Sequence, residues 1–166
     1  MAKQVNMAVP TASPLFLREA EIRRGVELLY FGYSNLTRSI DEGLAAQGLG
    51  RAHHRALYFV ARQPDITVGE LITLLAITKQ SLGRVLTDLT ERALIETRPG
   101  REDRRQRLLR LTPAGTQLEA ELFDALREKM TAAYSSAGQA AVGGFWAVLE
   151  GLIPADERKR VSDLGR

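Results

Sequence analysis

Two short β-prone segments interrupt a chain that otherwise has helical periodicity, and they limit the fold more than any other feature. Residues 94–98 (Leu-Ile-Glu-Thr-Arg) and 107–111 (Arg-Leu-Leu-Arg-Leu) flank a loop that opens with the turn signal Pro99-Gly100. Segments this close together pair as an antiparallel hairpin, and a lone hairpin is only marginally stable in water. It therefore has to pack on the helices around it. We predict a mainly α protein with a small β-hairpin (α+β).

Three short helices are predicted directly before the hairpin. The first runs from Arg51 to about Arg62 and stops before Pro64, because proline disfavours helix in the residue before it. The second opens with Thr67-Val68-Gly69-Glu70, which has the spacing of a capping box. The third covers about residues 79–92, with Thr78 as its N-cap.

The third of these helices has one apolar side and one polar side. Its apolar residues recur at the spacing i, i+3, i+4 and i+7, which is that of a single buried face. The opposite side carries groups that form hydrogen bonds, with Lys79 and Ser81 on its flanks. The apolar set is Leu82, Val85, Leu86 and Leu89, and the polar set is Gln80, Arg84 and Thr87.

Longer apolar stripes predict helices on both sides of this unit. One is expected over residues 15–47 and ends at Gly48-Leu49-Gly50, and the others cover residues 113–154 with a break at 135–138. Residues 51–112 can bury a core of their own, whereas the flanking faces are too wide for a monomer to cover. We expect the flanking helices to form a dimer interface; the alternative is that they fold back on their own chain. Residues 1–14 are expected to form a flexible arm and residues 155–166 a frayed charged tail.

Positive charge is concentrated on the hairpin. Residues 98–110 hold six arginines (98, 101, 104, 105, 107 and 110) against Glu102 and Asp103, a net charge of +4. The whole chain carries 23 Lys and Arg against 20 Asp and Glu, or +3, so the remainder is slightly acidic. Arginine binds phosphate through a planar fork of donors and stays charged. A basic hairpin after a polar-faced helix predicts a winged helix-turn-helix, with the helix in the major groove and the loop, or wing, on the backbone and minor groove.

Composition narrows the alternatives. The chain has no cysteine and only the adjacent pair His53 and His54, which excludes thiolate metal sites, a cysteine nucleophile and thiol-based sensing. No nucleophile–base pair or Gly-rich phosphate loop is recognisable, so we predict neither catalytic residues nor a cofactor or metal. With no apolar run long enough to span a membrane and no signal peptide, we expect a cytoplasmic protein. A winged-helix module that docks acidic proteins remains the main alternative to a DNA-binding regulator.

The run Asp103-Arg104-Arg105-Gln106-Arg107-Leu108-Leu109-Arg110-Leu111-Thr112-Pro113-Ala114-Gly115 resembles the wing signature of the MarR family of bacterial transcription regulators. Residues Ile77–Ile95 are similar to the family's recognition helix and first wing strand, although Ala93 replaces a common glycine. The resemblance covers about residues 15–154. It implies a homodimer that binds double-stranded DNA at a palindromic operator with two half-sites, and that responds to a small-molecule effector.

The resemblance also implies which residues contact DNA. On the helix they are Thr78, Lys79, Gln80, Ser81 and Arg84, among which we expect Gln80 and Arg84 to read bases, because glutamine pairs with adenine and arginine with guanine. For Lys79 and Ser81 a capping or phosphate role is equally open. In the wing they are Arg101, Arg104 and Arg105, with Asp103 bracing the arginines.

An effector pocket between the dimer helices and the winged unit is implied by the resemblance as well. Its candidate polar contacts are Tyr30, His53, His54 and Tyr58, although a histidine pair at a helix start is often surface-exposed or held in the core.

Overall fold

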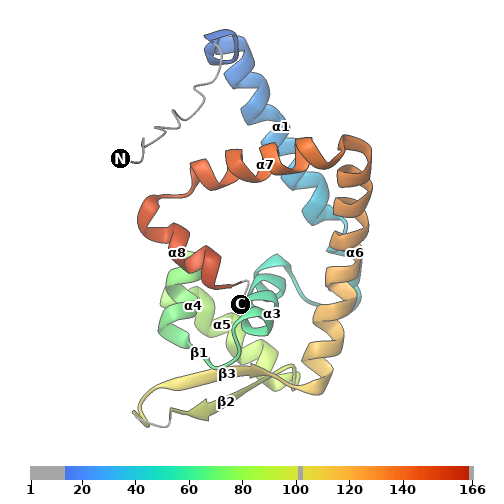
Figure 1. Cartoon of the computed structure of the whole chain (residues 1–166). Helices are drawn as coiled ribbons and strands as arrows, with labels where there is room; N and C mark the ends of the chain where they lie inside the picture. The colour runs from blue at the N-terminus through green and yellow to red at the C-terminus, as the bar shows by residue number, and fades with distance from the viewer. Residues whose placement is uncertain (1–13, 101–102, 165–166) are drawn as a thin grey trace, which may run out of the picture. The chain divides into compact units, whose positions relative to one another are not determined.

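The computed structural model describes residues 14–100 and 103–164. The chain divides after Asn35 into two units, and each is considered by itself. The elements, shown in Figure 1, are η1 (Pro14–Leu17), α1 (Glu19–Arg38), α2 (Asp41–Ala46), α3 (Arg51–Arg62), β1 (Ile66–Thr67), α4 (Val68–Leu75), α5 (Lys79–Glu91), β2 (Ile95–Pro99), β3 (Arg107–Leu111), α6 (Pro113–Ala137), α7 (Gln139–Leu152) and α8 (Ala155–Asp163). No helix within the described residues is both long and apolar enough to cross a membrane.

The predicted hairpin is the larger part of a three-stranded antiparallel sheet. Its order is β1-β3-β2, with Ile66 opposite Leu109 on one side of β3 and Thr97 opposite Leu109 on the other. Strand β1 was missed in the sequence because it has only two residues and no alternating pattern. Its strand geometry comes from pairing with β3, about forty residues later in the chain.

The core of the second unit lies between α3, α5 and the inner face of the sheet. Leu57 of α3, Leu82 and Leu89 of α5 and Leu109 of β3 are fully buried. The predicted apolar side of α5 is therefore the side that packs, with Val85 buried and Leu86 partly buried beside it. This leaves the opposite side of α5 exposed to solvent.

The helix starts predicted from local sequence are confirmed. Thr67 and Glu70 form the reciprocal capping box, with the Thr67 N–H donating to Glu70 Oε2 at 2.8 Å and the Glu70 N–H donating to Thr67 Oγ1 at 3.1 Å. Thr78 Oγ1 accepts from the Ser81 N–H at 3.2 Å at the start of α5. Thr112 caps α6 in the same way, with proline at the first helical position.

The glycine of the Leu-Thr-x-x-Gly run has a packing role. A Cβ at Gly115 would lie 2.0 Å from the carbonyl oxygen of Leu94, so no other residue fits there without moving the backbone. The same carbonyl accepts a hydrogen bond from the Thr112 N–H at 3.1 Å. Helix α6 therefore begins directly against the segment that joins α5 to β2.

Two predictions about the flanking segments were wrong, and a third is confirmed. The expected continuous helix over 15–47 is divided, since α1 ends at Arg38 and α2 begins at Asp41, where neither glycine nor proline marks the break. The predicted break at 135–138 is confirmed at its last residue: α6 continues through the serine pair to Ala137 and ends at Gly138, which has a positive φ of 82°. The tail expected to fray contains α8, whose C-terminal end accepts a hydrogen bond at the Leu164 carbonyl from Arg62 of α3.

Ala93 stands where the chain needs a left-handed residue. Its φ is 54°, and it ends α5 with two bonds typical of a Schellman motif: the Ala93 N–H donates to the Thr90 carbonyl and the Leu94 N–H donates to the Leu89 carbonyl. A Cβ is strained in this conformation, whereas glycine adopts it freely.

We therefore expect Ala93→Gly to raise the free energy of unfolding by about 1 kcal/mol, measured by urea denaturation. The matched control is Ala120→Gly, the same change at an exposed position inside α6, which should lower it by about 0.5–1 kcal/mol. Equal effects of the two substitutions would contradict the strain assigned to Ala93.

Candidate nucleic-acid interface

The exposed side of α5 presents three long polar side chains. Lys79, Gln80 and Arg84 are exposed, and Gln80 and Arg84 lie one helical turn apart on the same side. None of the three makes a hydrogen bond or an ion pair within the described part of the chain. Their donor and acceptor groups are therefore available to a ligand.

Thr78 and Ser81 are already partly engaged at the start of the helix. Besides the capping bond to the Ser81 backbone, Thr78 Oγ1 lies 2.9 Å from Ser81 Oγ. Both side chains are exposed, so each hydroxyl keeps some capacity to bond a phosphate oxygen. Thr78 therefore acts as the predicted N-cap, and Ser81, for which a capping or phosphate role was left open, takes part in this cap.

The wing joins β2 to β3. Arg104 and Arg105 are exposed at its outer end, and Arg101 lies outside the described residues. Asp103 Oδ1 accepts a hydrogen bond from the Arg105 N–H at 2.9 Å, and the Asp103 carbonyl accepts one from the Gln106 N–H at 3.0 Å. Asp103 thus stabilises the backbone turn that carries Arg104 and Arg105.

Two of the six clustered arginines form ion pairs with carboxylates of the same chain. Arg110 forms a bidentate ion pair with Asp65, with distances of 2.7 and 2.5 Å, and so ties β3 to the turn before β1. Arg98 pairs with Glu96 at 2.5 Å along β2. No local pattern predicts the pair of Asp65 and Arg110, because the two residues are 45 positions apart in the chain.

The other described arginines of the cluster form no ion pair with a described carboxylate. Among the described residues, no carboxylate pairs with Arg104, Arg105 or Arg107, and all three side chains are exposed. The net charge that the hairpin can offer to a ligand is therefore concentrated toward the outer end of the wing.

Comparisons with known proteins agree with this arrangement. Residues 47–106 match a model of the MarR family. The chain is 46% identical over 145 residues to the HTH-type transcriptional regulator PetP of Rhodobacter capsulatus, and the match covers 87% of each protein. The chain belongs to the MarR family. It is a transcriptional regulator by family, which is a function without catalysis.

Solved structures of MarR regulators share the fold. A MarR family regulator from Silicibacter pomeroyi superposes with a TM-score of 0.67 at 18% identity, over 86% of this chain and 94% of that one. A mutant MarR from E. coli, complexed with operator DNA, gives a TM-score of 0.65 at 22% identity, over 86% of this chain and all of that one. The similarity extends beyond the winged unit to most of the chain.

The residues expected to line an effector pocket belong to both units of the chain, and each is described within its own unit. Tyr30 lies on α1 in the first unit and is exposed. His53 of α3 bonds outward, to the backbone N–H of Gly50 and to Asp88. His54 and Tyr58, one turn apart on α3, face each other with ring centroids 6.1 Å apart, and Tyr58 also approaches Phe123 of α6 at 6.3 Å.

The structure also has a concavity beside the wing. Its volume is about 510 Å³, and it is lined by Asp65, Arg98, Pro99, Gly100, Gln106, Leu108 and Arg110. Both of its arginines and its aspartate take part in the ion pairs of the sheet described above. Its lining residues include none of the four that we had assigned to an effector.

The Nε2 atom of His54 is buried and has no hydrogen-bond partner in the described chain. Burial lowers the pKa of His54 below its ordinary value of 6.5, because the charged ring would lose its hydration. When the pH falls through 6.5, His54 binds a proton in the unfolded chain but stays neutral in the folded chain. Protonation therefore favours the unfolded chain, and His54 makes the folded protein less stable as the pH falls below 6.5.

We expect the free energy of unfolding to decrease as the pH is lowered from 7.5 to 5.5, and His54→Phe to remove part of this decrease. Phenylalanine keeps the ring contact with Tyr58 and has no group to protonate. Urea denaturation of both proteins at a fixed protein concentration gives their free energies of unfolding at each pH. In the difference between the two proteins, the contributions of the other titrating groups cancel. Parallel curves for the two proteins over this pH range would contradict the assignment.

Proposed function

We propose that this MarR regulator binds double-stranded DNA, with α5 in the major groove and the wing on the backbone and the adjacent minor groove. The observation that carries the proposal is the combination of two surfaces on one folded unit. One is the unbonded polar side of α5, with Lys79, Gln80 and Arg84. The other is the wing, whose exposed arginines have no partner among the described carboxylates.

Gln80 and Arg84 are proposed as the base-reading residues. Both have side chains long enough to reach base edges, and each matches a bidentate pattern, glutamine with adenine and arginine with guanine. Lys79, Thr78 and Ser81 lie at the start of the helix, where backbone N–H groups also favour phosphate. Arg101, Arg104 and Arg105 are proposed to contact the backbone and minor groove, with Asp103 holding their turn.

The working molecule is proposed to be a homodimer. Helix α1 buries none of its residues and exposes Ile22, Val26 and Tyr33 along the stripe found in the sequence. Helix α7 exposes Trp146, Val148 and Leu152. A second copy that covers these faces removes apolar surface from water, and a two-fold dimer matches a palindromic operator, with half-sites about 34–36 Å apart.

A small-molecule effector is proposed to change the spacing of the two DNA-binding units. Its site is proposed around His54 and Tyr58, where a buried nitrogen without a partner lies beside aromatic rings. The effector acts by binding one spacing more tightly than another. The competing function is docking to an acidic protein, for which the exposed wing arginines are equally suited.

Substitutions that remove one arginine at a time distinguish base reading from phosphate binding. Arg84→Ala is expected to cost about 1–3 kcal/mol on a duplex selected by the wild type and to relax its preference at one base position. Arg104→Ala is expected to weaken selected and random duplexes by similar factors and to reduce the salt slope by about one. Fluorescence anisotropy titrations at several salt concentrations measure both.

Glu128→Gln provides the control, since this exposed carboxylate lies on α6, away from α5 and the wing. Retention of no duplex by the wild type at low salt would favour the protein-docking function. Equal losses on selected and random DNA for Arg84→Ala would remove it as a base reader.

The dimer is tested on α1. Val26 is 64% exposed in the single chain, so Val26→Glu should cost little in an isolated monomer. In a dimer the charge is buried at the interface, and we expect the protein to sediment as a monomer at micromolar concentration. The control is Arg24→Glu, on the opposite side of the same helix, which should leave the sedimentation coefficient unchanged. A monomeric wild type would reject the dimer.

A further inference from the structure

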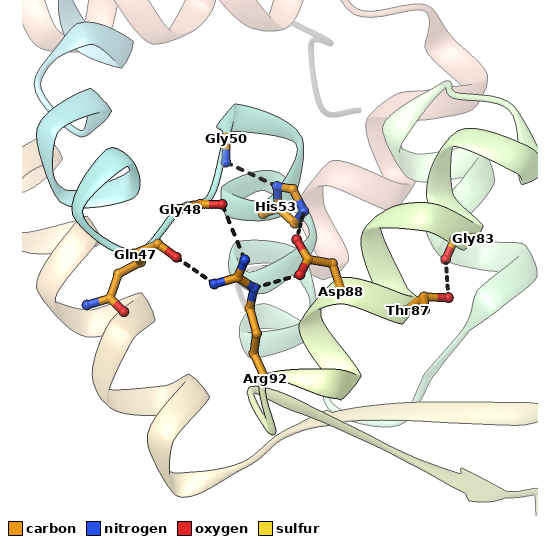
Figure 2. Close-up of polar contacts among 8 residues, drawn as sticks. All are labelled: Gln47, Gly48, Gly50, His53, Gly83, Thr87, Asp88 and Arg92. Carbon is orange, nitrogen blue, oxygen red and sulfur yellow. Dashed lines mark hydrogen bonds and ion pairs between the residues drawn. The ribbon is translucent and has the colours of Figure 1, made fainter.

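A polar cluster holds the C-terminal half of α5 against the start of α3, away from the residues proposed to touch DNA. Its members are Asp88 of α5, Arg92 just after α5, and His53 of α3 (Figure 2). Arg92 and His53 also bond to the backbone of residues 47–50, the α2–α3 corner, which connects α2 to α3. Asp88 and Arg92 are not among the residues expected to contact DNA or an effector.

Arg92 bridges α5 to the corner. Its Nε donates to Asp88 Oδ1 at 2.6 Å, and its Nη1 donates to the Gln47 carbonyl at 2.6 Å (Figure 2). Its Nη2 lies 3.5 Å from the Gly48 carbonyl oxygen. Gly48 has a φ of 65°, and a Cβ there would lie 3.5 Å from the guanidinium, so the corner takes a conformation that glycine allows and presents its carbonyls to the arginine.

His53 completes the cluster from α3. Its Nδ1 accepts a hydrogen bond from the Gly50 N–H at 3.1 Å, so in the neutral ring the hydrogen is on Nε2. Nε2 lies 2.9 Å from Asp88 Oδ2 and donates to it. The Asp88 carboxylate therefore accepts on both oxygens, one from its own helix segment and one from α3.

These bonds are directional, whereas the apolar contacts of α5 are not. Leu82, Val85 and Leu89 hold α5 on the core, but apolar burial alone permits small rotations of a helix about its axis. Side chains extend about 5–6 Å from the axis, so a rotation of about 10° moves their ends by about 1 Å. Asp88 is one turn after Arg84, and fixing it fixes the direction in which Arg84 points.

We propose that Asp88, held between Arg92 and His53, is a positioning residue that sets the rotation of α5 and so directs Gln80 and Arg84 onto their bases. The inference rests on the DNA-binding function proposed above. Asp88 acts through the helix and not by touching DNA. Its negative charge by itself opposes binding to phosphates, so a charge effect and a positioning effect have opposite signs.

Asp88→Asn tests this with almost no change of shape. The amide has one acceptor oxygen, so in either orientation its NH₂ group faces a donor, the Arg92 Nε–H or the His53 Nε2–H. Arg92→Lys keeps the positive charge but cannot reach two carbonyls and a carboxylate as a fork. Glu91→Gln is the matched control: it is the same loss of charge on an exposed residue of the same helix.

The full-length protein is first used to select duplexes from a randomised library. The dissociation constants of the selected duplex and of a scrambled duplex are then measured for each variant at one salt concentration, with circular dichroism as the check of folding. The specificity ratio is the dissociation constant of the scrambled duplex divided by that of the selected duplex. We expect Asp88→Asn and Arg92→Lys to reduce this ratio about tenfold, because the selected duplex binds more weakly. Glu91→Gln should leave this ratio unchanged.

Three results overturn the inference. If the wild type selects a sequence and Asp88→Asn keeps the wild-type ratio, only the positioning role fails. If Asp88→Asn strengthens both duplexes equally, Asp88 acts by charge alone. If the wild type selects no sequence, the proposed function fails and the inference with it. Should Asp88→Asn not fold, the ratio measured for Arg92→Lys decides.

Discussion

The carbonyl oxygen of Leu94 lies where three elements of the winged unit meet. It follows the left-handed Ala93 that ends α5, it accepts the Thr112 N–H that ends β3, and it packs against Gly115 in the first turn of α6. Because a Cβ at Gly115 has no room, α6 approaches the α5–β2 junction in direct backbone contact, and the Thr112 hydroxyl, which donates to the Ala93 carbonyl at 2.6 Å, holds it there. The position of the wing relative to α5 depends on this contact, and so does the direction in which α6 leaves the sheet toward α7.

Charge on the hairpin has two separate uses. Arg98 pairs with Glu96 within β2, and Arg110 pairs with Asp65 and ties β3 to the turn before β1, while the arginines of the outer wing keep their charge for a ligand. The count of six arginines therefore overstates the charge available to phosphate. Exposed ion pairs of this kind contribute little to stability individually, but a bidentate pair fixes geometry. In this sheet the Asp65–Arg110 pair holds β3 beside the short β1, which has only two residues to pair.

Local features were predictable from sequence, and features made by distant residues were not. The caps at Thr67 and Thr78 need only residues three positions apart, and the structure confirms both of them. Strand β1 and the Asp65–Arg110 pair depend on contacts across about forty residues, which no local pattern encodes. Of the candidate site, the exposed side of α5 followed from helical periodicity, since burial of one side decides the other. The bonds of His53 did not follow, because they depend on Asp88 and on the conformation of the α2–α3 corner.

This difference explains why the residues proposed to contact DNA and the residues proposed to aim them are found by different evidence. Residues that contact a ligand have to be exposed and polar, so amphipathic periodicity places Gln80 and Arg84 on the side of α5 open to a ligand, and the family resemblance singles them out. Residues that aim a helix have to bond sideways to other elements, and on α5 only the boundary between the buried and exposed sides permits this. Asp88 is at that boundary, partly buried, with one oxygen toward Arg92 and the other toward α3. A movement of the α2–α3 corner would therefore pass to α5 through Arg92, whose two carbonyl acceptors belong to that corner.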